Sequence, residues 1–309
     1  MPRPILITDG TDVLGRALVA VLTDEGRPVR VLVRSPEEAR DLAAAGAEPV
    51  EGDVRTPAVL DRALRTVEHV VLLSPPTPDQ VVTHGSVIEA AERTGRPVRL
   101  FPVLMMGALP PDAPVQLARW HAVTGAQIRS SGLAATTLRP QLLMQHLLRA
   151  AEGIRADGVI CGAFGPARLP HVDARDVAAA VRAVLTTPGH EGRSYVLTGP
   201  QALSYDELTA IVAEEMGRPV RYVDMAVEAY HEYLVGGGTP HWWADNLAAL
   251  ARLLRAGASW PVTSAVAELT GRPARTVRQF VREHVAAFRD GGAAAGTSCD
   301  AGRPCATPL

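Results

Sequence analysis

The stretch Ile5-Leu6-Ile7-Thr8-Asp9-Gly10-Thr11-Asp12-Val13-Leu14-Gly15-Arg16 decides the fold of this chain of 309 residues. Its apolar start predicts a strand, its polar middle predicts a tight turn, and a helix is expected from Gly15 onward. In dinucleotide-binding turns of this layout, glycines let the backbone approach a pyrophosphate and let the helix pack closely on the strand. Here aspartates, Asp9 and Asp12, stand at the first two glycine positions, and only Gly15 remains. The stretch therefore predicts a Rossmann-type fold with an altered cofactor loop.

Strands and helices alternate through the first half of the chain. Apolar runs predict strands at 5–8, 29–33, 67–73, 98–104 and 134–138, with a short strand within 46–53. Amphipathic segments predict helices at 15–25, 36–45, 56–66, 80–94 and 117–131. Continuous apolar strands between amphipathic helices are typical of a parallel sheet covered on both faces. We therefore expect an α/β fold, a doubly wound parallel Rossmann sheet, in residues 1–150.

The pattern loosens after residue 140. Short strands are expected near 158–163 and 194–197, and helices at 174–185, 204–216, 226–234, 242–257 and 274–289. We expect residues 151–290 to form a small irregular C-terminal substrate lobe that folds back onto the sheet. Residues 291–309 are small and polar, a composition that is typical of a disordered tail.

Charge, hydropathy and cysteine content limit the partners of the chain. The formal net charge of −2 gives no indication of a nucleic-acid partner. No apolar run is long enough to span a membrane and no leader is visible, so we expect a cytoplasmic protein without a membrane partner. Three cysteines without metal spacing predict no metal site. We expect a small-molecule substrate, and either a monomer or a homodimer.

Several later segments carry a family resemblance through their order and spacing. They are Val31-Leu32-Val33-Arg34, Gly52-Asp53-Val54, Val70-Val71-Leu72-Leu73-Ser74-Pro75-Pro76 and the segments 131–140, 172–178 and 269–280. On these segments the chain resembles the NmrA-like proteins, which are atypical short-chain dehydrogenases/reductases. The resemblance is to their NAD(P)H azoreductase and quinone-reductase-like branch.

The resemblance implies a cofactor site at the ends of the first strands. Its predicted residues are Gly10, Asp12, Gly15, Arg34, Asp53, Val54 and Ser74. In the family, the position of Arg34 meets the 2′-phosphate of NADP, and those of Asp53 and Val54 line the adenine. The loop that begins at Ser74 would lie near the nicotinamide ribose. Structural alternatives are a solvated charge for Arg34 and a braced turn for Asp53.

Asp9 and Asp12 decide whether that cofactor still binds. Asp9 stands where a steep turn favours glycine, and aspartate tolerates a positive φ with some strain. The side chain of Asp12 would occupy phosphate space, and like charges about 4 Å apart repel by about 1 kcal/mol in water. We therefore expect NADP(H) binding to be possible but weakened or lost. Two alternatives stay open. In one, both aspartates act as N-caps in an empty or rearranged loop. In the other, a shifted loop still binds the cofactor through Gly10 and Gly15.

The proton relay of the mainstream short-chain dehydrogenases is absent from this chain. Those enzymes use a serine and a Tyr-x-x-x-Lys motif. Here all 31 basic residues are arginine, and the first tyrosine is Tyr195. Imidazole titrates near neutrality, so His121 and His171 are the predicted acid/base residues. A structural role in an amphipathic helix is the alternative for His121.

An aromatic ligand is expected from the side chains that we predict around the substrate. These pocket residues are Met105, Met106, Trp120, Met144, Tyr230, Tyr233 and Trp242. Aromatic side chains stack on aromatic or polyketide-like ligands in apolar clefts. The alternative is a lid helix packed on the sheet, with the methionines as core filler.

Three functions remain in competition. The first is a small-molecule enzyme that performs non-redox tailoring, such as cyclisation, dehydration or isomerisation, of an aromatic or polyketide-like metabolite. The second is an NADPH-dependent oxidoreductase of quinone-like substrates. The third is a non-catalytic sensor or regulator, as some NmrA-like proteins are. The altered turn and the missing proton relay place the non-redox enzyme first.

Overall fold

A parallel sheet forms the centre of the molecule, and the computed structural model describes residues 3–289 apart from 106–108 and 110–111. The strands are β1 (Ile5–Ile7), β2 (Val29–Val33), β3 (Glu48–Glu51), β4 (His69–Leu72) and β5 (Arg99–Pro102). Their order across the sheet is β3-β2-β1-β4-β5. Ile5 pairs in parallel with Val29 on one side and with His69 on the other. The expected α/β fold with a parallel Rossmann sheet is confirmed.

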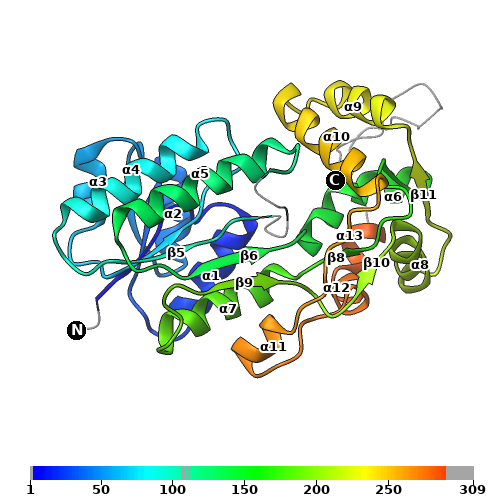
Figure 1. Ribbon diagram of the computed structural model, residues 1–309. Coiled ribbons are helices and arrows are strands. Elements are labelled where there is room, and N and C mark those ends of the chain that lie inside the picture. The colour runs from blue at the N-terminus through cyan, green and yellow to red at the C-terminus, as the bar shows by residue number, and fades with distance from the viewer. Residues whose placement is uncertain (1–2, 106–108, 110–111, 290–309) are drawn as a thin grey trace.

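Helices cover both faces of this sheet (Figure 1). One face carries α1 (Val13–Thr23), α2 (Pro36–Ala44) and α7 (Ala174–Thr186). The other face carries α3 (Pro57–Ala63), α4 (Gln80–Arg93) and α5 (Gln116–Ser131). Successive side chains of a strand point to opposite faces, so Ile5 and Ile7 pack into the first layer and Leu6 into the second. This double coverage explains why β1 and β2 are buried along their whole length.

The sheet continues beyond β5 through two further strands. β6 (Thr137–Pro140) meets the end of β5 at the bridge between Val103 and Leu138, and it pairs in parallel with β9 (Ser194–Leu197). α7 packs against α1, and α11 (Ala265–Thr270) packs against α7 and β9. Residues well beyond 150 therefore return to the Rossmann layers, and the chain crosses between the sheet and the lobe more than once.

The lobe is mostly helical and has a core of its own. Its helices are the 3₁₀ helix η1 (Met144–Ala150) and the α-helices α6 (Ala151–Asp157), α8 (Tyr205–Met216), α9 (Val227–Gly236), α10 (His241–Arg255), α12 (Val277–Glu283) and α13 (Val285–Arg289). Its strands are β7 (Val159–Gly162), β8 (Leu169–Pro170), β10 (Ala202–Leu203) and β11 (Arg221–Asp224), with β7 parallel to β11 and β8 antiparallel to β10. Tyr230, Phe280 and Phe288 are fully buried at its centre. Figure 1 shows the lobe helices α8, α9, α10 and α12 at one end of the molecule, beyond the sheet.

The lobe departs from the sequence prediction in several places. The single helix expected at 274–289 is broken at His284 into α12 and α13. β11 was not predicted, because its four residues, two charged at the ends and two half-buried between them, lack an apolar run. The helical segment at 144–157 was also missed. The expected disordered tail, 291–309, and the predicted pocket residue Met106 lie outside the described residues.

Neither a membrane-spanning helix nor a metal-binding cluster occurs in the part of the chain that the structure describes. No helix there combines the length and the apolar character that crossing a membrane requires. No group of three or more His, Cys, Asp or Glu side chains there is placed to hold a metal ion.

Candidate functional site

Two aspartates hold the turn between β1 and α1. Asp12 is the N-cap of α1, and its carboxylate accepts a hydrogen bond of 2.6 Å from the backbone N–H of Gly15. The carboxylate of Asp9 accepts from the N–H of Thr11 at 2.9 Å and from its hydroxyl at 2.8 Å. The strain expected at Asp9 is absent, because Thr66 is the only described non-glycine residue with a positive φ. Aspartate therefore fits the first glycine position without left-handed geometry.

Packing requires glycine at Gly15 and at its neighbour in the turn, Gly10. A Cβ at Gly15 would lie 2.4 Å from the carbonyl oxygen of Asp9, so α1 approaches β1 too closely for any side chain. A Cβ at Gly10 would lie 2.5 Å from Cγ1 of Val31 on β2. Gly10 is therefore packed against the sheet, and it is not among the residues that line the adjacent cavity.

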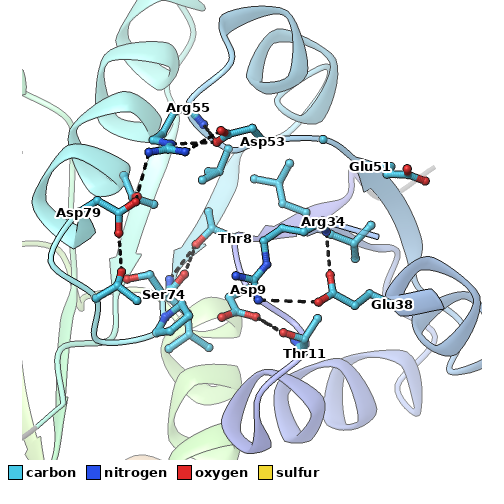
Figure 2. A pocket seen from close by; sticks show the side chains of 18 residues that line it. Thr8, Asp9, Thr11, Arg34, Glu38, Glu51, Asp53, Arg55, Ser74 and Asp79 are labelled. Carbon is cyan, nitrogen blue, oxygen red and sulfur yellow. Dashed lines mark hydrogen bonds and ion pairs between the residues drawn. The ribbon is translucent and has the colours of Figure 1, made fainter. Parts of the chain in front are cut away.

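A cavity of about 540 Å³, which we call the strand-end cavity, opens at the carboxyl ends of β1 to β4 (Figure 2). This edge includes the point between β1 and β4 where the strand order reverses, which is where open α/β sheets bind ligands. Thr8 joins the two strands there, since its hydroxyl accepts from the N–H of Leu73 at 2.9 Å. The polar and charged lining residues are Thr8, Asp9, Thr11, Arg34, Glu38, Glu51, Asp53, Arg55, Ser74, Thr77, Asp79 and Thr83. Arg34, Asp53, Val54 and Ser74, which the resemblance assigns to the cofactor, lie in this one cavity.

Carboxylates outnumber cations in the strand-end cavity by five to two. The exposed guanidinium of Arg34 lies 3.7 Å from the carboxylate of Glu38, and Figure 2 shows the Arg34 side chain lying across the opening. The guanidinium of Arg55 lies 2.8 Å from Asp53 and 3.3 Å from Asp79. Hydrogen bonds from Arg55 lower the pKa of Asp53. Both cations are therefore already paired, and Asp53 also braces its own turn.

A second cavity, of about 270 Å³, lies between the turn and the lobe, and we call it the lobe cavity. Its walls come from Asp12, Leu73, Ser74, Pro75, Pro76, Met105 and Leu117 on one side and from Leu142, Leu143, His146, Leu147, Arg149, Phe164, His171, Tyr205, Trp243, Leu247 and Leu250 on the other. Leu73, Ser74 and Pro75 line both cavities. The charged strand-end cavity therefore continues into an apolar one at the loop after β4.

The imidazoles of the lobe cavity are neutral near pH 7. Burial lowers the pKa of His146 and of His171 to about 4. Burial also raises the pKa of Tyr205 above its usual range. Water reaches the carboxylate of Asp12, but desolvation by the surrounding walls, with a contribution from the charge of Asp9, raises its pKa to about 6. At neutral pH the described part of this cavity holds no strong acid.

A buried hydrogen-bond chain fixes Ser74, which stands where the two cavities meet. The Ser74 hydroxyl lies 2.9 Å from Nε2 of His84, and Nδ1 of His84 lies 3.1 Å from the hydroxyl of Thr124. The side chain of Gln80 donates to the same Ser74 hydroxyl at 3.2 Å. His84 is fully buried, and burial lowers its pKa to about 4, so the chain is uncharged. The sequence analysis did not identify His84, because its role depends on a partner on α5.

The two predicted acid/base histidines are in different places. His171 lines the lobe cavity. His121 does not: it is 7% exposed on α5 and lines a third cavity, at β6. Leu117 lies one turn earlier on the same helix and lines the lobe cavity, whereas His121 lines the third one. His121 therefore lies outside the two joined cavities, and its predicted acid/base role stays a prediction.

Among the predicted methionine and tyrosine pocket residues, Met105 lines the lobe cavity. Met144 and Tyr230 are fully buried in the lobe core and do not line that cavity. Both residues pack in the lobe core, which for Met144 is the core-filler alternative.

The other aromatic residues predicted for the pocket do not line the lobe cavity. Trp120 and Tyr233 pack against the lobe core, and Trp242 lies against Trp120 with ring centroids 5.8 Å apart. None of these three lines the lobe cavity, whereas Trp243 does. His146 also lines it and was missed, because the sequence pattern gave no helix at that point. A helical assignment at 144–157 would have shown that His146 lies on an amphipathic turn.

The chain is similar to known proteins along most of its length. The model of the NmrA-like family matches residues 1–268. The NAD(P)H azoreductase of Xenophilus azovorans is 38% identical over 92% of this chain and 99% of that protein. The (4-alkanoyl-5-oxo-2,5-dihydrofuran-3-yl)methyl phosphate reductase of Streptomyces griseus is 38% identical over 92% of this chain and 99% of that protein. A crystal structure of the NADPH-dependent quinone oxidoreductase QOR2 of Escherichia coli, complexed with NADPH, has a TM-score of 0.82 at 28% identity and covers 91% of this chain and 99% of that one.

Proposed function

The chain belongs to the NmrA-like family, and on that premise we propose that it is an NAD(P)H-dependent oxidoreductase that reduces flat, largely apolar electrophiles. The observation that carries this proposal is the junction of two unlike cavities at Ser74 and Pro75. The polar strand-end cavity suits the adenosine half of a dinucleotide. The apolar lobe cavity suits a nicotinamide ring and the molecule that it reduces.

The named relatives support redox chemistry over non-redox tailoring. They are an azoreductase, a reductase of a dihydrofuranylmethyl phosphate and a quinone oxidoreductase. On this ground the oxidoreductase, which was the second hypothesis from sequence, becomes the main one. The same names favour NAD(P)H binding over the weakened or lost binding that the altered turn suggested.

The residues present fit a nicotinamide dinucleotide at both ends. Arg34 would face the ribose and any 2′-phosphate, and Ser74 would face the nicotinamide half. Between them, the N-terminus of α1 would receive the pyrophosphate, as helix N-termini do in this fold. The carboxylate of Asp12 already accepts from the N–H of Gly15 there. Binding therefore requires the carboxyl of Asp12 to rotate away from Gly15 or to become protonated.

The lobe cavity suits acceptors that need a positioned hydride more than a strong acid. A bound nicotinamide would supply that hydride. Leu117, Phe164 and Trp243 contribute apolar walls that exclude water. His146 and His171 are neutral because burial lowers the pKa of each to about 4. Quinone-like and azo substrates meet this condition, since their reduced forms spread the negative charge and can take a proton from water.

Calorimetric titration with NADPH and with NADH tests the proposal. We expect dissociation constants below about 100 µM for at least one cofactor, and turnover of a benzoquinone or an azo dye with the cofactor that binds. Replacing Asp9→Gly and Asp12→Gly together should tighten binding. If neither the natural chain nor this double variant binds either cofactor, the oxidoreductase proposal fails and the non-redox enzyme and the sensor remain.

A further inference from the structure

A third cavity, of about 430 Å³, lies apart from the other two, and we call it the arginine cavity. It is formed by α5, by β6 and by the residues that lead into β9. It shares no lining residue with the strand-end cavity or with the lobe cavity. The proposed reductase function makes no use of it.

The charged residues of the arginine cavity all have the same sign. Arg129, Arg139 and Arg193 line it, and no carboxylate does. Arg129 and Arg193 are exposed, whereas Arg139 is half-buried. In the described ranges, none of the three guanidinium groups forms an ion pair. This concentration of positive charge is local, because the whole chain has a formal net charge of −2.

Small residues on one face of α5 make the hollow. Ala118, Ala122 and Gly125 succeed one another at helical spacing and line the cavity. A Cβ at Gly125 would lie 3.4 Å from Nη1 of Arg129, so the guanidinium lies close over the helix at the point where a side chain is missing. Ile128 adds an apolar wall next to it. The cavity therefore combines an apolar floor with cationic groups.

A buried histidine in the wall has an unused polar atom. His121 is 7% exposed and lines the cavity, and its Nε2 has no hydrogen-bond partner among the described residues. Burial, assisted by the charges of His84 and Arg139, lowers the pKa of His121 to about 3, so the ring is neutral. A neutral imidazole has one donor and one acceptor nitrogen. Burying a polar atom without a partner is unfavourable, and a ligand in this cavity would remove that cost.

We infer that the arginine cavity binds a small organic anion. Its carboxylate or phosphate group is held by Arg129, Arg139 and Arg193, and its uncharged body lies against the small-residue face of α5. Guanidinium groups suit both anionic groups, because their planar donors match two oxygens at once. His121 contributes a hydrogen bond through Nε2. A dinucleotide is not the occupant, because the cavity is separate from the strand-end cavity.

Calorimetry on the full chain with phenyl phosphate, benzoate and inorganic phosphate tests this inference. We expect saturable binding of phenyl phosphate or benzoate, and weaker binding of inorganic phosphate, which lacks an apolar body. The stronger of the two aromatic probes identifies the preferred anionic group. Arg129→Ala and Arg193→Ala should each weaken binding about tenfold, because each removes a charge-assisted hydrogen bond.

Arg119→Ala is the matched control, since Arg119 is an exposed arginine on the same helix that does not line the cavity. It should leave the affinity unchanged, and so should Arg34→Ala in the strand-end cavity. A second readout is the ¹⁵N signal of Nε2 of His121, assigned by its loss in His121→Gln, which should shift on binding. The inference is overturned if no probe saturates, if Arg119→Ala or Arg34→Ala weakens binding as much as Arg129→Ala, or if the His121 signal does not move.

Discussion

Asp12 combines two roles that oppose each other. As the N-cap of α1 it satisfies the N–H of Gly15, which stabilises the helix start. The same N–H group belongs to the helix end that would hold a pyrophosphate, so the cap and the ligand compete for one donor. In the mainstream turn, glycine leaves that donor to the ligand. The aspartate therefore gives the turn a stable empty state in place of an open anion site.

Cofactor affinity should depend on the protonation of Asp12. Desolvation raises the pKa of its carboxyl to about 6, so the group is neutral well below that pH and charged above it. We expect NADH to bind more tightly as the pH falls from about 8 to about 5, because the repulsion of the pyrophosphate disappears. NADH is the appropriate ligand because the 2′-phosphate of NADPH titrates in the same range, at about pH 6.

The matched variant for this test is Asp12→Asn, which keeps an acceptor for the N–H of Gly15 but cannot titrate. Its NADH affinity should no longer show this pH dependence, and at pH about 8 it should exceed that of the natural chain. Calorimetric dissociation constants across the pH series provide the measurement. An Asp12→Asn variant with the original pH profile would assign the dependence to another group.

Arg34 and Glu38 should set the preference between NADPH and NADH. Arg34 is the cation expected at the 2′-phosphate, and Glu38 lies 3.7 Å from it while also accepting from its backbone N–H at 2.7 Å. Glu38→Gln keeps that acceptor and removes the competing charge. We expect the affinity ratio of NADPH to NADH to rise by a factor of about 1.4 to 5, since exposed ion pairs contribute about 0.2–1 kcal/mol. Arg34→Ala should lower the ratio, and an unchanged ratio in both variants would place the 2′-phosphate elsewhere.

At the scale of elements, the start of α5 is capped by the lobe. The N-cap residue Val115 has no side chain that can cap. The N–H of Leu117 instead donates to Oδ1 of Asn246 on α10 at 3.0 Å, and Asn246 donates to the carbonyl oxygen of Trp242 at 2.8 Å. Asn246 is buried, so one side chain joins the lobe to a helix of the sheet layer.

Removing this cap should destabilise the whole chain. Asn246→Ala leaves the N–H of Leu117 buried without a partner, and we expect a loss of about 1–3 kcal/mol in the free energy of unfolding. Arg252→Ala on the same helix is the control, because its pair with Glu228 is exposed and contributes little. Urea denaturation measures both variants. Equal stability of Asn246→Ala and the natural chain would mean that water replaces the amide.

The sequence predicts the sheet layers well, because they depend on local patterns. Continuous apolar runs and amphipathic helices identified β1, β2, β4 and β5 with the helices between them. The same patterns identified α10 but not the role of Asn246, since its partner on α5 is 129 residues away. The lobe strand β11 and the break at His284 depend on tertiary packing, which no local pattern reports.

At the scale of the whole molecule, topology explains why four residues that the family resemblance assigned to the cofactor lie together. Parallel strands end at one edge of the sheet, and Arg34, Asp53, Val54 and Ser74 line one cavity there. The lobe side was predicted poorly: Tyr230 is in the core and His121 lines another cavity. Residues of α5 line two different cavities. Which cavity each residue lines follows from packing between segments that are distant in the sequence, and no local sequence pattern reports it.

Four histidines make the stability of the whole molecule sensitive to acid. Burial lowers the pKa of His84, His146 and His171 to about 4 and that of His121 to about 3. The unfolded chain binds protons on these rings near pH 6.5. Between about pH 6.5 and 4 the unfolded state therefore holds more protons than the folded state, and the free energy of unfolding falls as the pH falls. Asp12 acts in the opposite direction over part of this range, because its folded pKa is raised to about 6.

Urea denaturation at several pH values should therefore show a steep loss of stability below about pH 6.5. Each proton taken up only by the unfolded state contributes about 1.4 kcal/mol per pH unit, and the proton that Asp12 takes up in the folded state opposes this loss. His171→Gln should reduce the slope by about one proton, since it removes one buried ring that cannot titrate in the folded state. Asp12→Asn should make the slope steeper, because it removes the opposing group. A stability that stays flat between about pH 6.5 and 4.5 would mean that these rings accept protons without unfolding, and that water reaches them in the folded state.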